Sequence, residues 1–254
     1  MYQTAVIIGS GNVAYHLTRA LMQVPVEVLM MYSRTPSHAA ETGLRLNIPV
    51  TSDLKQLPTH ASLYIYAVSD NALPEILAHE LAPNALHVHT AGSVDLGVFP
   101  SHKPHCGVLY PLQTFSKNKE LNFRDVPFFV EATTAQDAEL LVQLASLLSN
   151  QVYRTTSAQR RQLHLAAVFA CNFVNHLYAI ANELVVSSEL PFEVLRPLIA
   201  ETASKIATLS PREAQTGPAI RRDSSVLQNH TSMLAGFPEY QEIYTMLSRS
   251  ISGK

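Results

Sequence analysis

The first 155 residues alternate short, continuously apolar runs with segments of helical periodicity. Continuous apolar strands separated by helices are typical of a parallel sheet that helices cover on both faces. The sequence therefore predicts an α/β fold with a Rossmann-like, mostly parallel, doubly wound sheet. The predicted strands are 4–8, 26–32, 48–50, 63–68, 86–89, 107–112, 126–131 and 152–154, and the predicted helices between them include 14–22, 36–46, 73–81 and 135–148.

No strand is predicted after residue 155, where helical patterns cover 158–187, 192–209, 224–234 and 239–251. We therefore predict two domains, a nucleotide-binding domain over 1–155 and an all-α domain over 156–254. The most apolar stretch, 163–186, is interrupted by several polar side chains. Polar groups are rare within membrane spans, so this stretch predicts a buried helix of a soluble protein.

A glycine-rich turn directly follows the first predicted strand and begins the first helix. Its residues are Gly9, Ser10, Gly11, Asn12, Val13 and Ala14. In this context the first glycine permits a tight turn, the second lets the backbone approach a pyrophosphate, and the alanine lets helix and strand pack closely. We expect Gly9 to Val13 to bind the pyrophosphate of a dinucleotide at the helix N-terminus.

The end of the second predicted strand carries Ser33, Arg34 and Thr35, where an NAD-binding domain has an acidic residue. An acidic side chain there binds the ribose 2′-hydroxyl of NAD, whereas a cation with two hydroxyls suits the 2′-phosphate of NADP. The alternative is a solvated arginine at a strand end. The position of Arg34 relative to the glycine turn favours an NADP(H) site over this alternative.

The composition excludes several classes of function. A net charge of −2 gives no electrostatic basis for binding nucleic acid or an anionic membrane. Cys106 and Cys171 do not have the spacing of a disulfide framework. The N-terminus has neither the basic region nor the cleavage site of a signal peptide. We therefore expect a cytoplasmic protein with no nucleic-acid or membrane partner.

Several motifs resemble an uncharacterised bacterial family that joins a Rossmann-like NADP-binding domain to a helical domain of unknown function. These motifs are GSGNVA, YSRT, YAVSDNAL at 66–73, HTAGS at 89–93, YPLQTF at 110–115, HLAAVFACNFVNHLY at 164–178 and QTGPAIRRD at 215–223. The family is similar in architecture to pyrroline-5-carboxylate reductases and, more distantly, to β-hydroxyacid dehydrogenases. The resemblance implies an NADP-linked oxidoreductase that dimerises through its helical domain.

The resemblance also implies two further cofactor-binding segments. Ala67, Val68 and Ser69, at the carboxyl end of the fourth strand, would line the nicotinamide ribose. Thr90, Ala91, Gly92 and Ser93, after the fifth strand, would approach the nicotinamide. Both positions agree with ligand binding outside the carboxyl ends of parallel strands.

Hydride transfer requires a proton donor or polarising group beside the substrate's C=O or C=N bond. The candidates are His89, Tyr110, Gln113, His164, Asn172 and Asn175. In an α-helix, His164 and Asn175 lie roughly 20° apart, with Asn182 on the same stripe. Such a stripe either lines a cleft or consists of satisfied core polar groups. We predict a cleft with His164, Asn172 and Asn175 as catalytic residues.

That helix departs from the β-hydroxyacid dehydrogenases, which carry a lysine followed four positions later by an asparagine. Here the helix has no lysine, and Val168 follows His164 by four positions. His164 would then replace the lysine as the acid. The missing lysine leaves a protein without turnover as an alternative.

Two groups of residues suggest a metal. His87 and His89 would share a face of a strand, and His102, His105 and Cys106 lie close together in the sequence. Neither group has the second ligand pair of a closed metal site, so we predict no metal.

The segment 215–223 is a predicted connection between helices. It either ends in a helix N-cap, or it presents Arg221 to a substrate carboxylate or to another subunit. The sequence favours neither interpretation.

Together these features predict an NADP(H)-dependent oxidoreductase that reduces a small imine or carbonyl substrate in a cleft between the two domains, as a homodimer through the helical domain. Three alternatives remain open: a sensor of NADP without turnover, an enzyme that uses another reduced cofactor such as a deazaflavin, and a dimeric scaffold.

Overall fold

The computed structural model describes residues 3–253 and contains two compact units, Met1–Asn172 and Phe173–Lys254. The last strand ends at Arg154, and only helices and loops follow it within the described residues. The secondary structure thus changes close to residue 155, whereas the two units divide further along, inside the long helical stretch. The division into functional domains at 155 stays a prediction.

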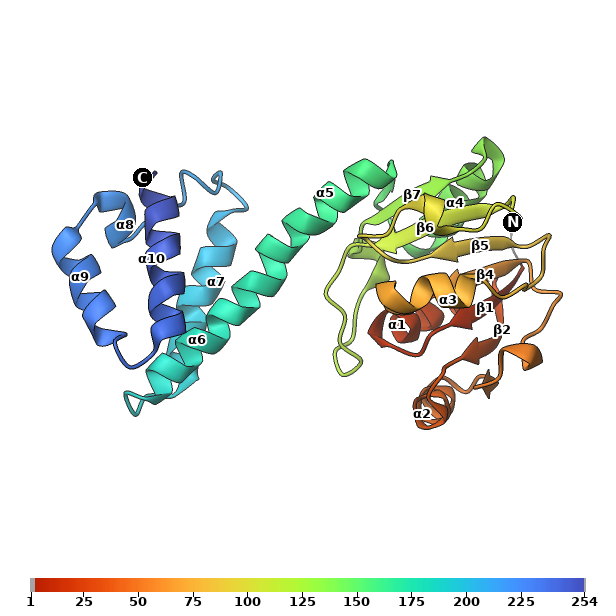
Figure 1. The fold of residues 1–254 in the computed structure, drawn as a ribbon, viewed down its shortest axis with the longest axis horizontal. Helices are drawn as coiled ribbons and strands as arrows, with labels where there is room; N and C mark the ends of the chain where they lie inside the picture. The colour runs from red at the N-terminus through yellow and green to blue at the C-terminus, as the bar shows by residue number, and fades with distance from the viewer. Residues whose placement is uncertain (1–2, 254) are drawn as a thin grey trace. The chain divides into compact units, whose positions relative to one another are not determined.

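An eight-stranded sheet forms the centre of the first unit (Figure 1). Its strand order is β3-β2-β1-β4-β5-β6-β7-β8, and every pair is parallel except β6 with β7. The predicted mostly parallel Rossmann-like sheet is therefore confirmed. The strands are β1 (Thr4–Ile8), β2 (Glu27–Tyr32), β3 (Val50–Thr51), β4 (Leu63–Tyr66), β5 (Leu86–His89), β6 (Cys106–Pro111), β7 (Phe128–Ala132) and β8 (Val152–Arg154).

Strand residues alternate between two apolar clusters, one on each face of the sheet. Ala5 and Ile7 of β1 pack in a cluster with α1 (Asn12–Leu21) and α4 (Ala135–Leu148). Val6 and Ile8 pack on the other face in a cluster with α3 (Leu73–Leu77). Both faces of the sheet are buried, which explains why apolar residues follow one another along the central strands β1 and β4.

Helix α2 (Pro36–Leu46) matches its predicted range, and its ends follow from single residues. Pro36 begins the helix, where its missing N–H leaves no bond unmade. Asn47 ends the helix in the left-handed conformation, with φ 53°. Because Thr35 precedes this helix, the N-terminus of α2 lies directly after the Ser33–Thr35 segment.

The long helix predicted over 158–187 is interrupted. Helix α5 (Ser157–Ala167) passes into a π-helical segment, Val168–Phe173, and then into α6 (Val174–Val186). A π turn takes about one residue more than an α turn, so α-helical spacing does not hold across this segment. The predicted alignment of His164 with Asn175 is therefore wrong, because hydrophobic periodicity does not reveal a π turn.

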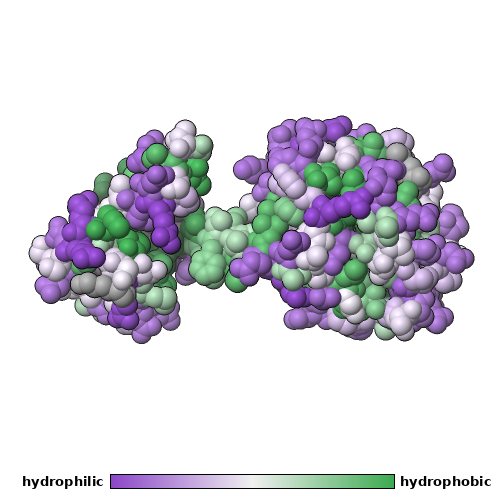
Figure 2. Space-filling view, turned by 90° about the horizontal axis from the view of Figure 1, so that it is seen from above, coloured by the Kyte–Doolittle hydropathy of each residue, from purple (hydrophilic) through white to green (hydrophobic). Residues whose placement is uncertain are grey.

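The prediction that this stretch is buried is also wrong for the single chain. Leu165 and Phe169 are 50% and 62% exposed, and Figure 2 shows apolar residues at the surface of the stretch. Its length and composition would also suit a membrane span, with a mean hydropathy of 1.4. These two properties alone are weak evidence for such a span.

The second unit consists of helices in the part that the structure describes. They are α6, a 3₁₀ turn (Phe192–Leu195), α7 (Arg196–Lys205), α8 (Pro218–Arg221), α9 (Ser224–Met233) and α10 (Pro238–Ser252). Its large apolar side chains include many that are exposed, such as Leu198 and Met246 at 64% and 65%. A unit this small leaves much of its apolar surface uncovered.

Candidate functional site

The carboxyl ends of β1, β2 and β4 enclose a hollow of about 400 Å³, called here the nucleotide hollow. Three predicted segments line it, namely Gly9–Gly11 after β1, Ser33–Thr35 after β2, and Ala67–Ser69 after β4. Parallel strands end at the same edge of a sheet, which brings these distant segments together. The structure thus gathers most of the predicted cofactor residues in one place.

Glycine is present at the two positions of the turn for different structural reasons. Gly9 has φ +124°, and a Cβ there would lie 2.2 Å from the carbonyl oxygen of Ala67. A side chain at this position would therefore collide with the backbone directly after β4. Gly11 has nothing within 4 Å of a Cβ position, so its backbone faces open space. This space is where a phosphate group could approach the first amides of α1.

A hydrogen bond joins the glycine turn to the end of β2. The Ser10 hydroxyl donates to the Ser33 hydroxyl over 2.8 Å. Beside this bond, Arg34 is exposed and forms no ion pair within residues 3–253. Thr35 is the N-cap of α2, yet its hydroxyl makes no capping bond. A guanidinium, a hydroxyl and helix amides are thus available to an anion.

The same hollow includes residues that we did not predict. His38 comes from the first turns of α2, whereas Glu75, Ile76 and His79 come from α3 and its end. Their only sequence signal is helical spacing beside a predicted binding segment. Such spacing cannot show which helix faces a ligand.

A second hollow of about 650 Å³ lies beside His164 and is called here the His164 hollow. It lies within the first unit and is lined by residues from three segments. These are Asn12 and Val13 of α1; Tyr110 and 112–115 of β6 and its loop; and Leu163, His164, Ala166, Ala167, Ala170, Cys171 and Asn172 of α5 and the π segment. The hollow therefore adjoins the glycine turn through the start of α1.

His164 lies against Tyr110 and Gly92. The Nδ1 atom of His164 is 3.0 Å from the Tyr110 hydroxyl oxygen, at hydrogen-bond distance. A Cβ on Gly92 would lie 2.6 Å from that Nδ1 atom and 2.8 Å from Tyr110 Cζ. Only a glycine therefore lets the two rings meet here. Burial raises the pKa of Tyr110, so its hydroxyl stays protonated well above neutral pH.

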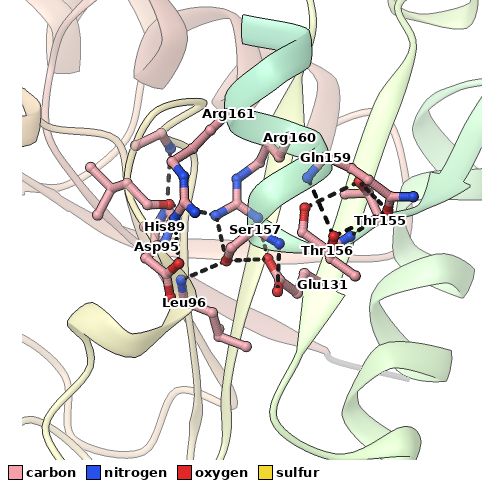
Figure 3. A network of polar contacts seen from close by, with 12 residues as sticks. His89, Asp95, Leu96, Glu131, Thr155, Thr156, Ser157, Gln159, Arg160 and Arg161 are labelled. Atoms are coloured by element: carbon pink, nitrogen blue, oxygen red, sulfur yellow. Dashed lines mark hydrogen bonds and ion pairs between the residues drawn. The ribbon is translucent and has the colours of Figure 1, made fainter.

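A buried ion pair fixes the start of α5, one helical turn before His164 (Figure 3). The Arg160 guanidinium is fully buried, binds the Glu131 carboxylate of β7, and also donates to the carbonyl oxygen of Val94. Ser157 donates to the same carboxylate, 2.8 Å from its backbone N and 2.8 Å from its hydroxyl. This network connects α5 to the sheet and to the segment after β5.

Two other features strengthen this beginning of α5. Thr156 and Gln159 form a capping box, which satisfies the free amides of the first turn. Arg161 pairs with Asp95, and both side chains are about half exposed. Because a helix moves as a rigid element, these contacts also determine where His164 lies.

The loop after β6 folds back over α1. The Asn12 side-chain amide donates to the carbonyl oxygen of Phe115 over 2.9 Å, and His16 Nε2 is 2.8 Å from the carbonyl oxygen of Ser116. Asn12 and Val13 line the His164 hollow and are not among the residues that line the nucleotide hollow. The Asn12 side chain thus holds a loop, and its backbone amide lies at the start of α1, where a pyrophosphate would bind.

The remaining predicted residues, Asn172, Asn175 and the segment after β5, do not all lie in one hollow. Asn172 lines the His164 hollow, but Asn175 belongs to the second unit, so the structure does not bring it to this hollow. Thr90 donates to the carbonyl oxygen of Tyr66, and the Ser93 hydroxyl donates to the Asp70 carboxylate. Between them, Gly92 contacts His164, and Ala91 is half-buried without a side-chain polar group.

The histidines of β5 are core residues. His87 bonds the Tyr66 hydroxyl at 2.9 Å, and His89 accepts a 3.2 Å bond from the Ala91 backbone N–H. Burial lowers the pKa of each to about 4, so both are neutral at pH 7. No group of three or more potential metal ligands occurs within residues 3–253.

His105 and Cys106, which were grouped in the sequence, have separate partners, and Cys106 begins β6. His105 pairs with Asp137 of α4, and the Cys106 thiol donates to the carbonyl oxygen of Lys103. Burial raises the pKa of Cys106 to about 12, which keeps the thiol protonated and unreactive.

The connection at 215–223 ends in the N-cap that one interpretation predicted. The Asp223 carboxylate accepts a 3.2 Å bond from the Val226 backbone N–H and begins α9. This confirms the structural interpretation, while a binding role for Arg221 stays a prediction.

No curated protein matches this sequence. Residues 126–251 match a domain of unknown function (DUF2520). The chain is 47% identical to the "putative NADP oxidoreductase" of Bacteroides fragilis, with a TM-score of 0.95, covering 100% of this chain and 99% of that one.

Two more distant structures share the fold at 13% identity. An imine reductase from Myxococcus stipitatus, solved with NADP⁺, has a TM-score of 0.66 and covers 98% of this chain and 92% of its own. A 1-pyrroline-5-carboxylate reductase from Streptococcus pyogenes has a TM-score of 0.64, with coverages of 99% and 98%. The full-length identity to the Bacteroides fragilis protein and the domain match show that the chain belongs to the uncharacterised family of Rossmann-like proteins that carry DUF2520.

Proposed function

We propose that this protein is an NADPH-dependent oxidoreductase that reduces a small imine or carbonyl compound in the His164 hollow. The observation that carries the proposal is the contact of His164 with Tyr110 and Gly92, in a hollow that begins beside the glycine turn. Proton-donating groups thus lie near the place where a dinucleotide would present its reactive end.

The residues of the nucleotide hollow fit a dinucleotide with a 2′-phosphate. The open space at Gly11 would admit the pyrophosphate, and the unpaired Arg34 with Ser33 and Thr35 would bind the adenosine phosphate. When bound, the reduced nicotinamide would supply a hydride. Ala67 to Ser69 would line the path between the phosphates and the nicotinamide ribose.

The Tyr110–His164 pair would supply the proton that reduction requires. If His164 Nδ1 donates, the Tyr110 hydroxyl is free to donate to the substrate; in the other tautomer, His164 Nε2 carries the free proton. In either case the pair holds one donor for an oxygen or nitrogen that gains negative charge. Asn172 would orient the substrate from the same side.

The names of the similar proteins support the proposed reductase activity. The Bacteroides fragilis relative is named as an NADP oxidoreductase, and proteins of the same fold include an imine reductase and a 1-pyrroline-5-carboxylate reductase. These names cover C=N reduction but leave this protein's substrate open.

We also propose a homodimer that forms through the helices. Leu165, Leu198 and Met246 are each at least half exposed in the single chain, and large apolar side chains left uncovered on helices are typical of interfaces. Sedimentation over a range of concentrations tests this proposal. A monomer at every concentration would contradict it.

A binding titration with NADPH and NADH, followed by a screen of ketones, aldehydes and imines at 340 nm, tests the proposed function. We expect tighter binding of NADPH and its oxidation by at least one compound. Tight binding without any turnover would favour the sensor. No binding of either nucleotide would favour another cofactor or a scaffold.

A further inference from the structure

We propose that the His164 hollow selects uncharged carbonyl or imine compounds with an apolar body, and discriminates against analogues that carry a carboxylate or an ammonium group. This inference rests on the proposed function of the hollow and names its substrate class. It follows from which side chains line the hollow.

The lining contains no lysine, arginine, aspartate or glutamate within the described residues. Its apolar part comes from side chains such as Leu112, Phe115 and Leu163, and its polar part from neutral groups such as Gln113 and Asn172. A buried charge without a partner is strongly unfavourable, whereas a neutral polar group needs only a hydrogen bond. The lining supplies neutral hydrogen-bonding groups, and its imidazole, that of His164, is already bonded to Tyr110.

Two cations near this hollow make contacts outside its lining. The Arg160 guanidinium is bound to Glu131 and is fully buried. Lys117, on the loop after β6, donates to the Thr42 hydroxyl of α2. Neither cation is among the residues that line the hollow.

The polar groups of the lining also have defined roles. The Asn12 amide is used by the loop, and Tyr110 and His164 are bonded to each other. Gln113 accepts the backbone N–H of Thr114 through its side-chain oxygen, which leaves its amide NH₂. With Asn172, this offers an uncharged set of donors and acceptors to a substrate.

Three ring ketones that differ in one substituent test the inference. They are 4-oxocyclohexanecarboxamide, which is uncharged; 4-oxocyclohexanecarboxylate, which is its anionic isostere; and 4-aminocyclohexanone, which is cationic. Their Kd values are measured calorimetrically on the full chain saturated with NADP⁺. We expect the amide to bind roughly tenfold or more tightly than either charged compound.

A charged variant of the lining checks the electrostatic cause. Ala166 lies on α5 at the hollow, and a helix accepts both arginine and glutamine at such a position. Ala166→Arg should tighten binding of the carboxylate by roughly threefold or more, because it supplies a cation. Ala166→Gln, which is long but neutral, should leave the carboxylate unchanged.

The outcomes separate this inference from the proposed function. Binding of the carboxylate as tight as that of the amide, or equal effects of the two Ala166 variants, would overturn the inference. Failure of all three ketones to bind the NADP⁺-saturated protein would overturn it as well. If the amide is preferred but NADPH never reduces it or any other compound, the inference stands and the proposed turnover fails.

Discussion

His164 Nδ1 and the Tyr110 hydroxyl oxygen lie 3.0 Å apart, although 54 residues separate them in the sequence. The contact requires the glycine at position 92, and it joins α5 to the end of β6. It joins two residues that were separate candidates in the sequence, and the proposed function gives them one role, the supply of a proton.

Replacing His164 by alanine should lower turnover far more than NADPH affinity, because the lost side chain acts on the reacting atoms. General acid catalysis contributes on the order of 10²-fold or more, so kcat should fall by about that factor. Steady-state rates with a substrate from the screen and NADPH titrations measure the two effects. Gln162→Ala, on an exposed face of α5, is the control. A loss of affinity as large as the loss of kcat would place His164 in cofactor binding.

Replacing Arg34 by alanine should weaken NADPH selectively. A charge-assisted contact to the 2′-phosphate contributes about 1.5–3 kcal/mol, which corresponds to a Kd increase of about tenfold or more. NADH lacks this phosphate, so its Kd should change little. Arg45→Ala is the matched control, because Arg45 lies on α2 and pairs with Glu41. Equal losses for both nucleotides would show that Arg34 does not recognise the phosphate.

Replacing Arg160 by methionine should strongly destabilise the first unit. The change leaves the Glu131 carboxylate without its buried partner, and breaking such a pair costs about 3–5 kcal/mol. Adding Glu131→Gln should restore part of the loss. Arg154→Met breaks an exposed pair with Glu139 and should cost less than about 1 kcal/mol. Urea unfolding of the four proteins measures these differences, and similar losses for Arg160→Met and Arg154→Met would contradict the role of burial.

The free energy of unfolding should fall as the pH drops from 6.5 to 4. His87 and His89 have pKa values lowered to about 4 in the fold, chiefly by burial, whereas unfolded histidine takes up a proton near pH 6.5. In this window only the unfolded chain is protonated, so each histidine lowers stability by roughly 2 kcal/mol at pH 5 compared with pH 7.

Urea unfolding at pH 7 and pH 5 measures this pH dependence. His87→Asn should reduce the difference in the free energy of unfolding between pH 7 and pH 5 by the contribution of one histidine. This holds even if the variant is less stable at both pH values. His60→Asn is the control, since His60 is exposed and outside the sheet. The same pH dependence in all three proteins would rule out the buried histidines as its source.

The sequence predicts local structure well where one residue or one periodicity decides it. The apolar runs of β1 and β5 have the bounds that they predict, and Pro36 begins α2. The sequence does not predict the structure where contacts between distant residues determine it. A charged residue on a helix is usually exposed, so nothing marks Arg160 as buried. The bond from Asn12 to Phe115 spans 103 residues, and no local pattern indicates it.

The candidate site, too, could be predicted where local patterns determine it and not elsewhere. Segments that end parallel strands could be assigned to one edge, and Gly9–Gly11, Ser33–Thr35 and Ala67–Ser69 do share a hollow. Asn175 was assigned through α-helical spacing, and the π segment removes that basis.

A crystal structure with NADP⁺ bound tests the central claim most directly. We predict the adenosine 2′-phosphate in contact with the Arg34 guanidinium, and the nicotinamide ring in the His164 hollow, facing the Tyr110–His164 pair. A nicotinamide ring outside that hollow, or a dinucleotide whose 2′-phosphate lies away from Arg34, would contradict the account.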